Sequence, residues 1–103
     1  MKEVTATELQ KLLKEPSKVE VIDVRETMEV QMGMIPNAIH IPLGEIQSRM
    51  SELEKKKEYV IVCRSGNRSG VATQFLQAYG YDAANMVGGM LDWNGEIQTN
   101  FGG

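Results

Sequence analysis

The sequence of 103 residues contains one cysteine, Cys63, and one histidine, His40. A single cysteine excludes a disulfide within the chain and any metal site that needs several thiolates. A single histidine argues against a zinc site built from imidazoles. No other pattern indicates a bound group, so we expect neither a metal nor an organic cofactor. His40 lies in a short apolar stretch, where we expect a structural role with one hydrogen-bond partner.

Positive charge is scarce as well: 11 lysines and arginines stand against 14 aspartates and glutamates, a net charge of −3. A nucleic-acid-binding surface is therefore not indicated. No apolar run approaches the length that spans a membrane, and residues 1–4 do not form an apolar signal region. We expect a protein of the reducing cytoplasm, where a reactive thiol remains usable, with neither a nucleic acid nor a membrane as partner.

Short apolar runs alternate with helical patterns, and the chain is long enough for one domain with a proper core. Strands are predicted at 19–24, 39–41, 59–62 and 83–87, and helices from residue 5, over 26–32, over 43–50, after residue 70 and after residue 89. This alternation predicts an α/β fold of three layers, in which helices cover both faces of a mostly parallel sheet. Segment 96–103 lacks periodicity and is expected to be a flexible tail of a single domain spanning 1–103.

Two helices have clear boundary signals. Thr5 and Glu8 form the pattern of a capping box at the start of the first helix, and Pro16 with Ser17 is expected to end it. Gly80 is expected to end the helix that follows residue 70. Apolar spacing also predicts the buried face of each helix. These faces are Leu9, Leu12 and Leu13 for the first helix, and Val71, Ala72, Phe75, Leu76 and Tyr79 for the second.

The only cysteine directly follows a predicted buried strand. The polar loop after it contains a glycine and two arginines and leads into a helix. A helix N-terminus presents unpaired N–H groups and partial positive charge, which together favour an anion. With the guanidinium groups of Arg64 and Arg68 added, the pKa of the Cys63 thiol is expected to fall and the thiolate to become a nucleophile. The alternative is an inert core cysteine, which needs no anion-binding loop.

A second polar group, Asp23 with Arg25, stands at the end of the predicted strand 19–24. Ligands of open parallel sheets bind at the carboxyl ends of strands. Because Cys63 also follows a strand, we expect these three residues to share one rim of the sheet. Asp23 and Arg25 are expected to organise this rim by pairing with loop backbone.

Four segments of the chain, in this order, resemble those of a single-domain rhodanese, a sulfurtransferase. They are Val21-Ile22-Asp23-Val24-Arg25-Glu26, Gly33 to Leu43, Cys63 to Ser69, and Gly88-Gly89-Met90-Leu91-Asp92-Trp93. The resemblance covers nearly the whole chain and implies an α/β domain with a parallel sheet between helices. It also implies that Cys63 accepts a sulfane sulfur as a persulfide and passes it to a nucleophile, as in thiol–disulfide exchange.

The resemblance further implies how the loop binds its substrates. Backbone N–H groups of the loop would cradle the terminal sulfur, and Arg64 and Arg68 would hold an anionic donor such as thiosulfate. The loop residues are Arg64, Ser65, Gly66, Asn67, Arg68 and Ser69. A protein persulfide is an alternative donor, and cyanide or a thiol, such as that of a thioredoxin-like protein, is the expected acceptor. Met34 and Asn37 depart from the family pattern, which has His and Gly at these positions.

Three other functions stay open. One is a cysteine phosphatase or arsenate reductase of the same fold, in which five residues separate the cysteine from the arginine. Here four residues separate Cys63 from Arg68. This loop is one residue shorter and therefore suits a single sulfur better than a phosphate. A non-catalytic rhodanese-like module would bind a partner without using its thiol. A sulfur carrier is suggested only by the last two residues, Gly102 and Gly103.

Overall fold

The computed structural model of the chain describes residues 2–15 and 19–99. The helix end expected at Pro16 and Ser17, and the terminal glycines, lie outside these residues. The strands are β1 (Glu3–Val4), β2 (Val19–Asp23), β3 (Ile39–His40), β4 (Glu58–Val62) and β5 (Asp82–Met86). The α-helices are α1 (Ala6–Lys14), α2 (Thr27–Gln31), α3 (Ile46–Arg49) and α4 (Asn67–Ala78), and the 3-10 helices are η1 (Leu43–Glu45), η2 (Met50–Glu52) and η3 (Gly89–Asp92).

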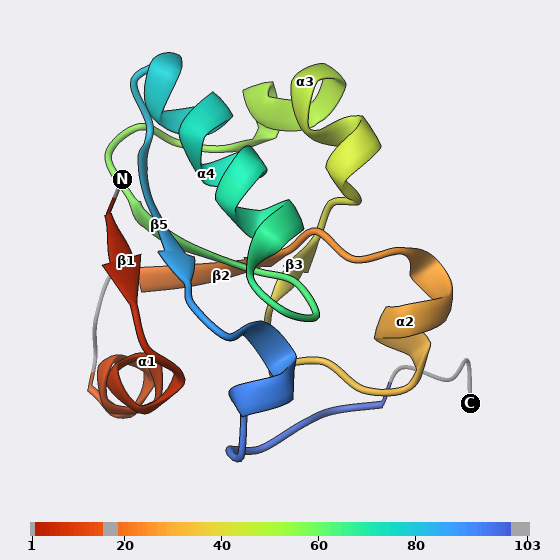
Figure 1. The fold of residues 1–103 in the computed structure, drawn as a ribbon. Coiled ribbons are helices and arrows are strands. Elements are labelled where there is room, and N and C mark those ends of the chain that lie inside the picture. The colour runs from red at the N-terminus through yellow and green to blue at the C-terminus, as the bar shows by residue number, and fades with distance from the viewer. Residues whose placement is uncertain (1, 16–18, 100–103) are drawn as a thin grey trace.

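The five strands form one parallel sheet in the order β1-β5-β4-β2-β3, which confirms the predicted α/β fold. Strand β4 is central, between β5 and β2. Helices α3 and α4 cover one face of the sheet and α1 the other, as Figure 1 shows. The short edge strand β1 was not predicted, because two residues are too few to show an alternating pattern.

Strands β2, β4 and β5 bury side chains on both faces of the sheet, which explains their nearly continuous apolar runs. In β4, Ile61 packs toward α3 and α4, whereas Val60 and Val62 pack toward α1. Successive side chains of a strand point to opposite faces. Cys63, which follows Val62, therefore lies on the same face as Ile61, beneath α4.

Two predicted helix boundaries are confirmed, the start of α1 and the end of α4. Glu8 N–H donates to Thr5 Oγ1 at 3.1 Å, and Thr5 N–H donates to Glu8 Oε1 at 2.8 Å, which closes the capping box. Gly80 has a φ of +91°, and Tyr81 N–H donates to Leu76 O at 3.0 Å. This left-handed residue closes the C-terminus of α4, a conformation that glycine adopts without steric cost.

The predicted buried faces were partly wrong. Ala6 and Leu9 are the buried residues of α1, while Leu13 lines an open hollow. In α4, Val71 and Tyr79 are exposed, and the buried residues are Ser69, Gly70, Ala72, Thr73 and Leu76. Ser69 and Thr73 are hydroxyl residues, and a pattern of apolar spacing does not detect them.

Two further segments differ from their expectations. The helix expected over 43–50 is divided into η1, α3 and η2, with Ile46 buried as predicted. The expected tail makes contacts in its described part: Met34 and Gln98 exchange two backbone hydrogen bonds of 3.0 and 2.7 Å. Trp93 Nε1 donates to Glu96 O at 2.9 Å.

None of the described helices is long and apolar enough to cross a membrane.

Candidate functional site

The Cys63 side chain is fully buried at the carboxyl end of β4, inside the turn that leads to α4. Gly66 N–H donates to Cys63 Sγ at 3.0 Å, and Ser69 Oγ donates to it at 3.2 Å. Gly66 has a φ of +103°, and a Cβ there would lie 3.2 Å from Gly88 N. Glycine is thus required where the loop turns back toward the sulfur.

The local hydrogen bonds set the charge state of the thiol. Burial by itself raises the pKa of Cys63, but hydrogen bonds from the Ser69 side chain and from the backbone of Ser69, Gly66 and Ser65 outweigh it, so the pKa is lowered. The charge of Arg68 also interacts with that of Cys63, but the largest contributions that lower the pKa of Cys63 are hydrogen bonds. The donors are a hydroxyl and backbone N–H groups of the turn and of the first turn of α4.

The carbonyl groups of the same loop are bound from the other side by η3. Met90 N–H donates to Cys63 O at 2.8 Å, and Leu91 N–H donates to Arg64 O at 3.0 Å. Gly89 has a φ of +58°, and a Cβ on it would approach Arg64 O to 2.5 Å. The segment 88–93 therefore fixes the loop by engaging its carbonyl oxygens, while N–H groups of the loop remain directed at the sulfur.

Asp23 and Arg25 form a buried ion pair at the end of the neighbouring strand β2. Arg25 Nη2 lies 2.9 Å from Asp23 Oδ2, and Arg25 Nε lies 3.0 Å from Asp23 Oδ1. Arg25 Nη2 also donates to Gly33 O at 2.8 Å. The loop backbone that this pair binds is thus the turn after α2, not the Cys63 loop. His40 Nε2 binds Arg25 O at 2.7 Å, which supplies its expected hydrogen-bond partner.

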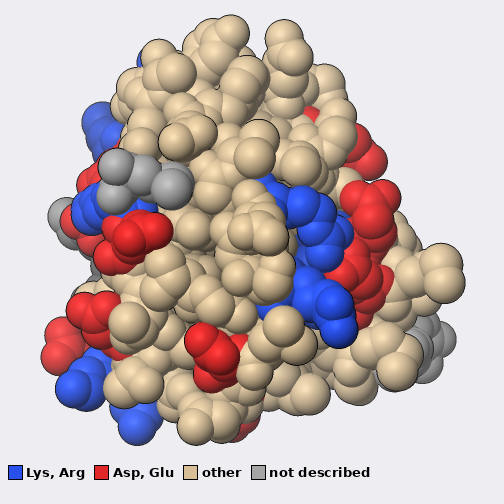
Figure 2. All heavy atoms as spheres, in the orientation of Figure 1, with Lys and Arg blue, Asp and Glu red and all other residues tan. Residues whose placement is uncertain are grey.

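The two loop arginines differ in their surroundings. Arg68 is held by Glu29 of α2, with Arg68 Nη1 2.7 Å from Glu29 Oε1 and Arg68 Nη2 2.8 Å from Glu29 Oε2. Arg64 is exposed and forms no ion pair with any residue in 2–15 or 19–99. Figure 2 shows an area of basic atoms bordering an area of acidic atoms to the right of centre. One of the two cations expected to bind an anion is therefore already neutralised.

The chain matches the sequence model of the Rhodanese-like domain over residues 5–96. It belongs to the rhodanese-like family. The Bacillus subtilis protein YtwF, which carries a provisional sulfurtransferase name, is 43% identical over 98 residues and 95% of both chains. A protein of Allochromatium vinosum named sulfurtransferase is 38% identical over 92 residues, 88% of this chain and 86% of the relative.

Solved structures agree with this assignment. A rhodanese-like domain protein from Staphylococcus aureus is 39% identical and superposes with a TM-score of 0.93, over 98% of this chain and 100% of the other. The rhodanese-like fold expected from the sequence is thereby confirmed. The names of the relatives support a role in sulfur transfer, which involves a sulfur donor and a sulfur acceptor.

One polar residue of this rhodanese-like domain was missed by the sequence analysis. Asn85, buried in β5, accepts a hydrogen bond from Ser69 Oγ at 2.5 Å and donates from Nδ2 to Gly66 O at 3.1 Å. It thus contacts both residues whose donors reach Cys63 Sγ. The available signal was an asparagine inside an otherwise apolar strand, a residue type that strands disfavour.

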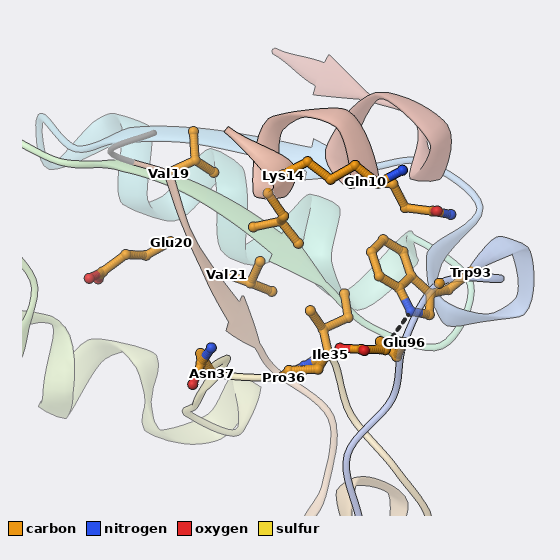
Figure 3. A pocket seen from close by; sticks show the side chains of 12 residues that line it. Gln10, Lys14, Val19, Glu20, Val21, Ile35, Pro36, Asn37, Trp93 and Glu96 are labelled. Carbon is orange, nitrogen blue, oxygen red and sulfur yellow. Dashed lines mark hydrogen bonds between the residues drawn. The ribbon is translucent and has the colours of Figure 1, made fainter. Parts of the chain in front are cut away.

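The larger hollow on the domain lies away from Cys63. It has a volume of about 580 Å³ and is bounded by α1, β2, the turn at 35–37 and the segment at 93–96. Figure 3 shows the ring of Trp93 and the side chain of Ile35 at this hollow, with Lys14 and Glu20 at its edge. A shallower hollow of about 450 Å³ adjoins the Cys63 loop at Ser65, Gly66 and Asn67. In the part of the chain that the structure describes, no three metal-binding side chains gather at either place.

Proposed function

We propose that this rhodanese-like domain is a sulfurtransferase that carries sulfane sulfur as a persulfide on Cys63. The donor is a compound such as thiosulfate, and the acceptor is a thiophile such as cyanide or a thiol. The observation that carries the proposal is the set of hydrogen bonds around Cys63 Sγ, which lowers the pKa of the thiol inside a loop fitted to a sulfur anion.

The reaction has two displacement steps. The Cys63 thiolate attacks the outer sulfur of thiosulfate, the S–S bond breaks, and its electron pair leaves with sulfite. The acceptor then attacks the terminal sulfur of the Cys63 persulfide, which restores the thiolate. Each step moves one sulfur atom and needs no other oxidant or reductant.

The remaining site residues have supporting roles in this proposal. The loop from Arg64 to Ser69 binds the terminal sulfur through its N–H groups, and Arg64 supplies an exposed positive charge for the donor. Asp23 and Arg25 organise the rim, because their buried pair fixes the turn at Gly33 relative to β2. The proposed unit is a single domain of residues 1–103, working in the cytoplasm with a small anion or a protein persulfide as donor and a thioredoxin-like thiol protein as acceptor.

Phosphatase chemistry is the less favoured alternative. The Arg68 guanidinium, which lies one position short of the phosphatase arginine, is bound to Glu29. A carboxylate at that position opposes the approach of a dianionic phosphate. A binding module without catalysis would give no function to the lowered pKa of Cys63.

The test is the intact mass of the reduced protein after incubation with thiosulfate, with Cys63→Ser as the matched variant. We expect the wild type to gain one sulfur atom and to lose it to cyanide with release of thiocyanate. Cys63→Ser should fold, because serine differs from cysteine by one atom, and should gain nothing. A sulfur atom acquired equally by both proteins would refute the assignment.

A further inference from the structure

The ion pair between Glu29 and Arg68 links α2 to the first turn of α4, next to the Cys63 loop. It is bidentate, because each guanidinium nitrogen faces its own carboxylate oxygen at 2.7 or 2.8 Å. Glu29 Oε1 also accepts a hydrogen bond from Glu26 N–H at 3.0 Å, which fixes the carboxylate at the start of α2. Two parallel charge-assisted hydrogen bonds are among the stronger polar contacts in proteins.

This pairing changes the electrostatic character of the site. The hydrogen bond from Arg68 lowers the pKa of Glu29 to about 2, although partial burial acts in the opposite direction, so the carboxylate is ionised at neutral pH. Arg68 also interacts electrostatically with the charges of Cys63 and Glu26. A second anion that approaches Arg68 therefore meets a neutralised cation and at least one carboxylate.

We propose that Glu29 determines which donor the Cys63 site prefers: by holding Arg68, it disfavours the thiosulfate dianion and favours sulfane donors with a single negative charge, as in a persulfide. The inference rests on the proposed function and specifies its donor class. Glu29 touches neither the reacting sulfur nor the donor in this scheme; it acts through Arg68 as a positioning residue.

The chemistry is the same for both donor classes. The Cys63 thiolate attacks the outer sulfur, the S–S bond of the donor breaks, and the electron pair leaves with sulfite from thiosulfate or with a thiolate from a persulfide. The products are a Cys63 persulfide and the leaving anion in each case. The classes differ in the negative charge that must be brought beside Glu29, which is larger by one for thiosulfate.

Thiosulfate and methanethiosulfonate form a matched pair of probes for this charge. Both carry the transferable sulfur on a sulfonyl sulfur, and a methyl group in the second replaces one anionic oxygen of the first. The measurement is kcat/KM for persulfidation of Cys63, followed by intact mass, in the wild type and in Glu29→Gln. Glutamine is accepted at this position of a capping box, so the variant loses the charge and keeps the hydrogen bond to Glu26.

We expect Glu29→Gln to raise kcat/KM about tenfold for thiosulfate and less than about twofold for methanethiosulfonate, because Arg68 becomes available to the second charge. The double variant Glu29→Gln/Arg68→Gln should lose this selective gain. Glu52→Gln is the control: Glu52 also pairs with an arginine, Arg49, and its replacement changes the net charge equally, but away from the site. It should leave the ratio of the two donors unchanged.

The outcomes separate this inference from the proposed function. A donor ratio that is the same in the wild type and Glu29→Gln, with sulfur transfer intact, would overturn the role of Glu29 alone. A wild type that acquires no sulfur from either donor would overturn both. Where Glu29→Gln does not give a folded protein by circular dichroism, Glu29→Asn removes the same charge and the same expectation applies.

Discussion

Ser69 and Asn85 share a hydrogen bond inside the domain, and the same Ser69 hydroxyl lies 3.2 Å from Cys63 Sγ. A hydroxyl carries one proton, so Ser69 donates to either the asparagine oxygen or the sulfur at one time. Formation of the thiolate therefore favours rotation of this proton from Asn85 toward Cys63. The reactive sulfur is coupled through one side chain to the neighbouring strand β5.

Ser69→Ala is expected to raise the pKa of Cys63, because the thiolate loses a hydrogen-bond donor. A hydrogen bond to a charged group contributes about 1.5–3 kcal/mol, so alkylation of Cys63 at neutral pH should slow by about tenfold or more. The pH profile of the alkylation rate measures this effect. An unchanged profile would show that the backbone N–H groups alone set the charge state.

Asn85→Asp is expected to raise the pKa of Cys63 as well, by a different cause. The substitution puts a carboxyl group beside Ser69 and removes the donor to Gly66 O, so two oxygens face each other. The buried change should also lower the free energy of unfolding by about 1–3 kcal/mol. Asn85→Leu, which lacks the charge, is the control. An equal alkylation profile in both variants would rule out the contribution of charge.

Gly89→Ala is expected to displace the Cys63 loop. A Cβ at this position would lie 2.5 Å from Arg64 O and 2.6 Å from Cys63 O, and the backbone there has a positive φ. We expect a loss of stability of about 1–3 kcal/mol and slower sulfur transfer. Gly44→Ala is the matched control, since a Cβ on Gly44 meets nothing within 4 Å. Urea unfolding and the persulfidation rate are the two measurements, and a Gly89→Ala protein equal to Gly44→Ala in both would contradict this account.

The Glu29–Arg68 pair should make part of the stability dependent on pH. The pKa of Glu29 is about 2 in the folded protein, below the ordinary value of 4.5. A lowered pKa stabilises the folded state above the ordinary value, and this contribution disappears as the pH falls from about 4.5 toward 2. Because the pair is partly exposed, we expect about 1 kcal/mol at neutral pH. The difference in unfolding free energy between the wild type and Glu29→Gln, measured at pH 7 and pH 3, should shrink at the lower pH.

The sequence predicted the parallel sheet and the place of Cys63 because both depend on local patterns. A β-branched run, a polar loop with glycine and the start of a helix follow one another within residues 59–70. The hydroxyl residues Ser69 and Thr73 on the buried face of α4 were not predicted. Their burial depends on hydrogen-bond partners inside the domain: Thr73 Oγ1, for example, donates to Ser69 O at 2.7 Å. The spacing of apolar residues does not indicate such hydrogen bonds.

The partner of each charge was the least predictable feature of the site. Arg68 and Glu29 are separated by 39 positions, and the sequence offers several carboxylates to either loop arginine. Only the placement of α2 beside the first turn of α4 decides that Arg68 is paired and Arg64 is not. The expectation that both arginines hold an anionic donor came from the family resemblance, which does not show that Arg68 pairs with Glu29.

The pairing of β1 with β5 bears on the order of events during synthesis. Glu3 lies beside Asn85 and Val4 beside Met86, so β1 cannot pair until β5 has been synthesised. The turn around Cys63 also depends on Met90 and Leu91, which bind the carbonyl oxygens of Cys63 and Arg64. A nascent chain that ends before these residues lacks the two hydrogen bonds that hold the carbonyl oxygens of the loop. The loop around Cys63 is thus fully braced only after residues 85–91 have been synthesised.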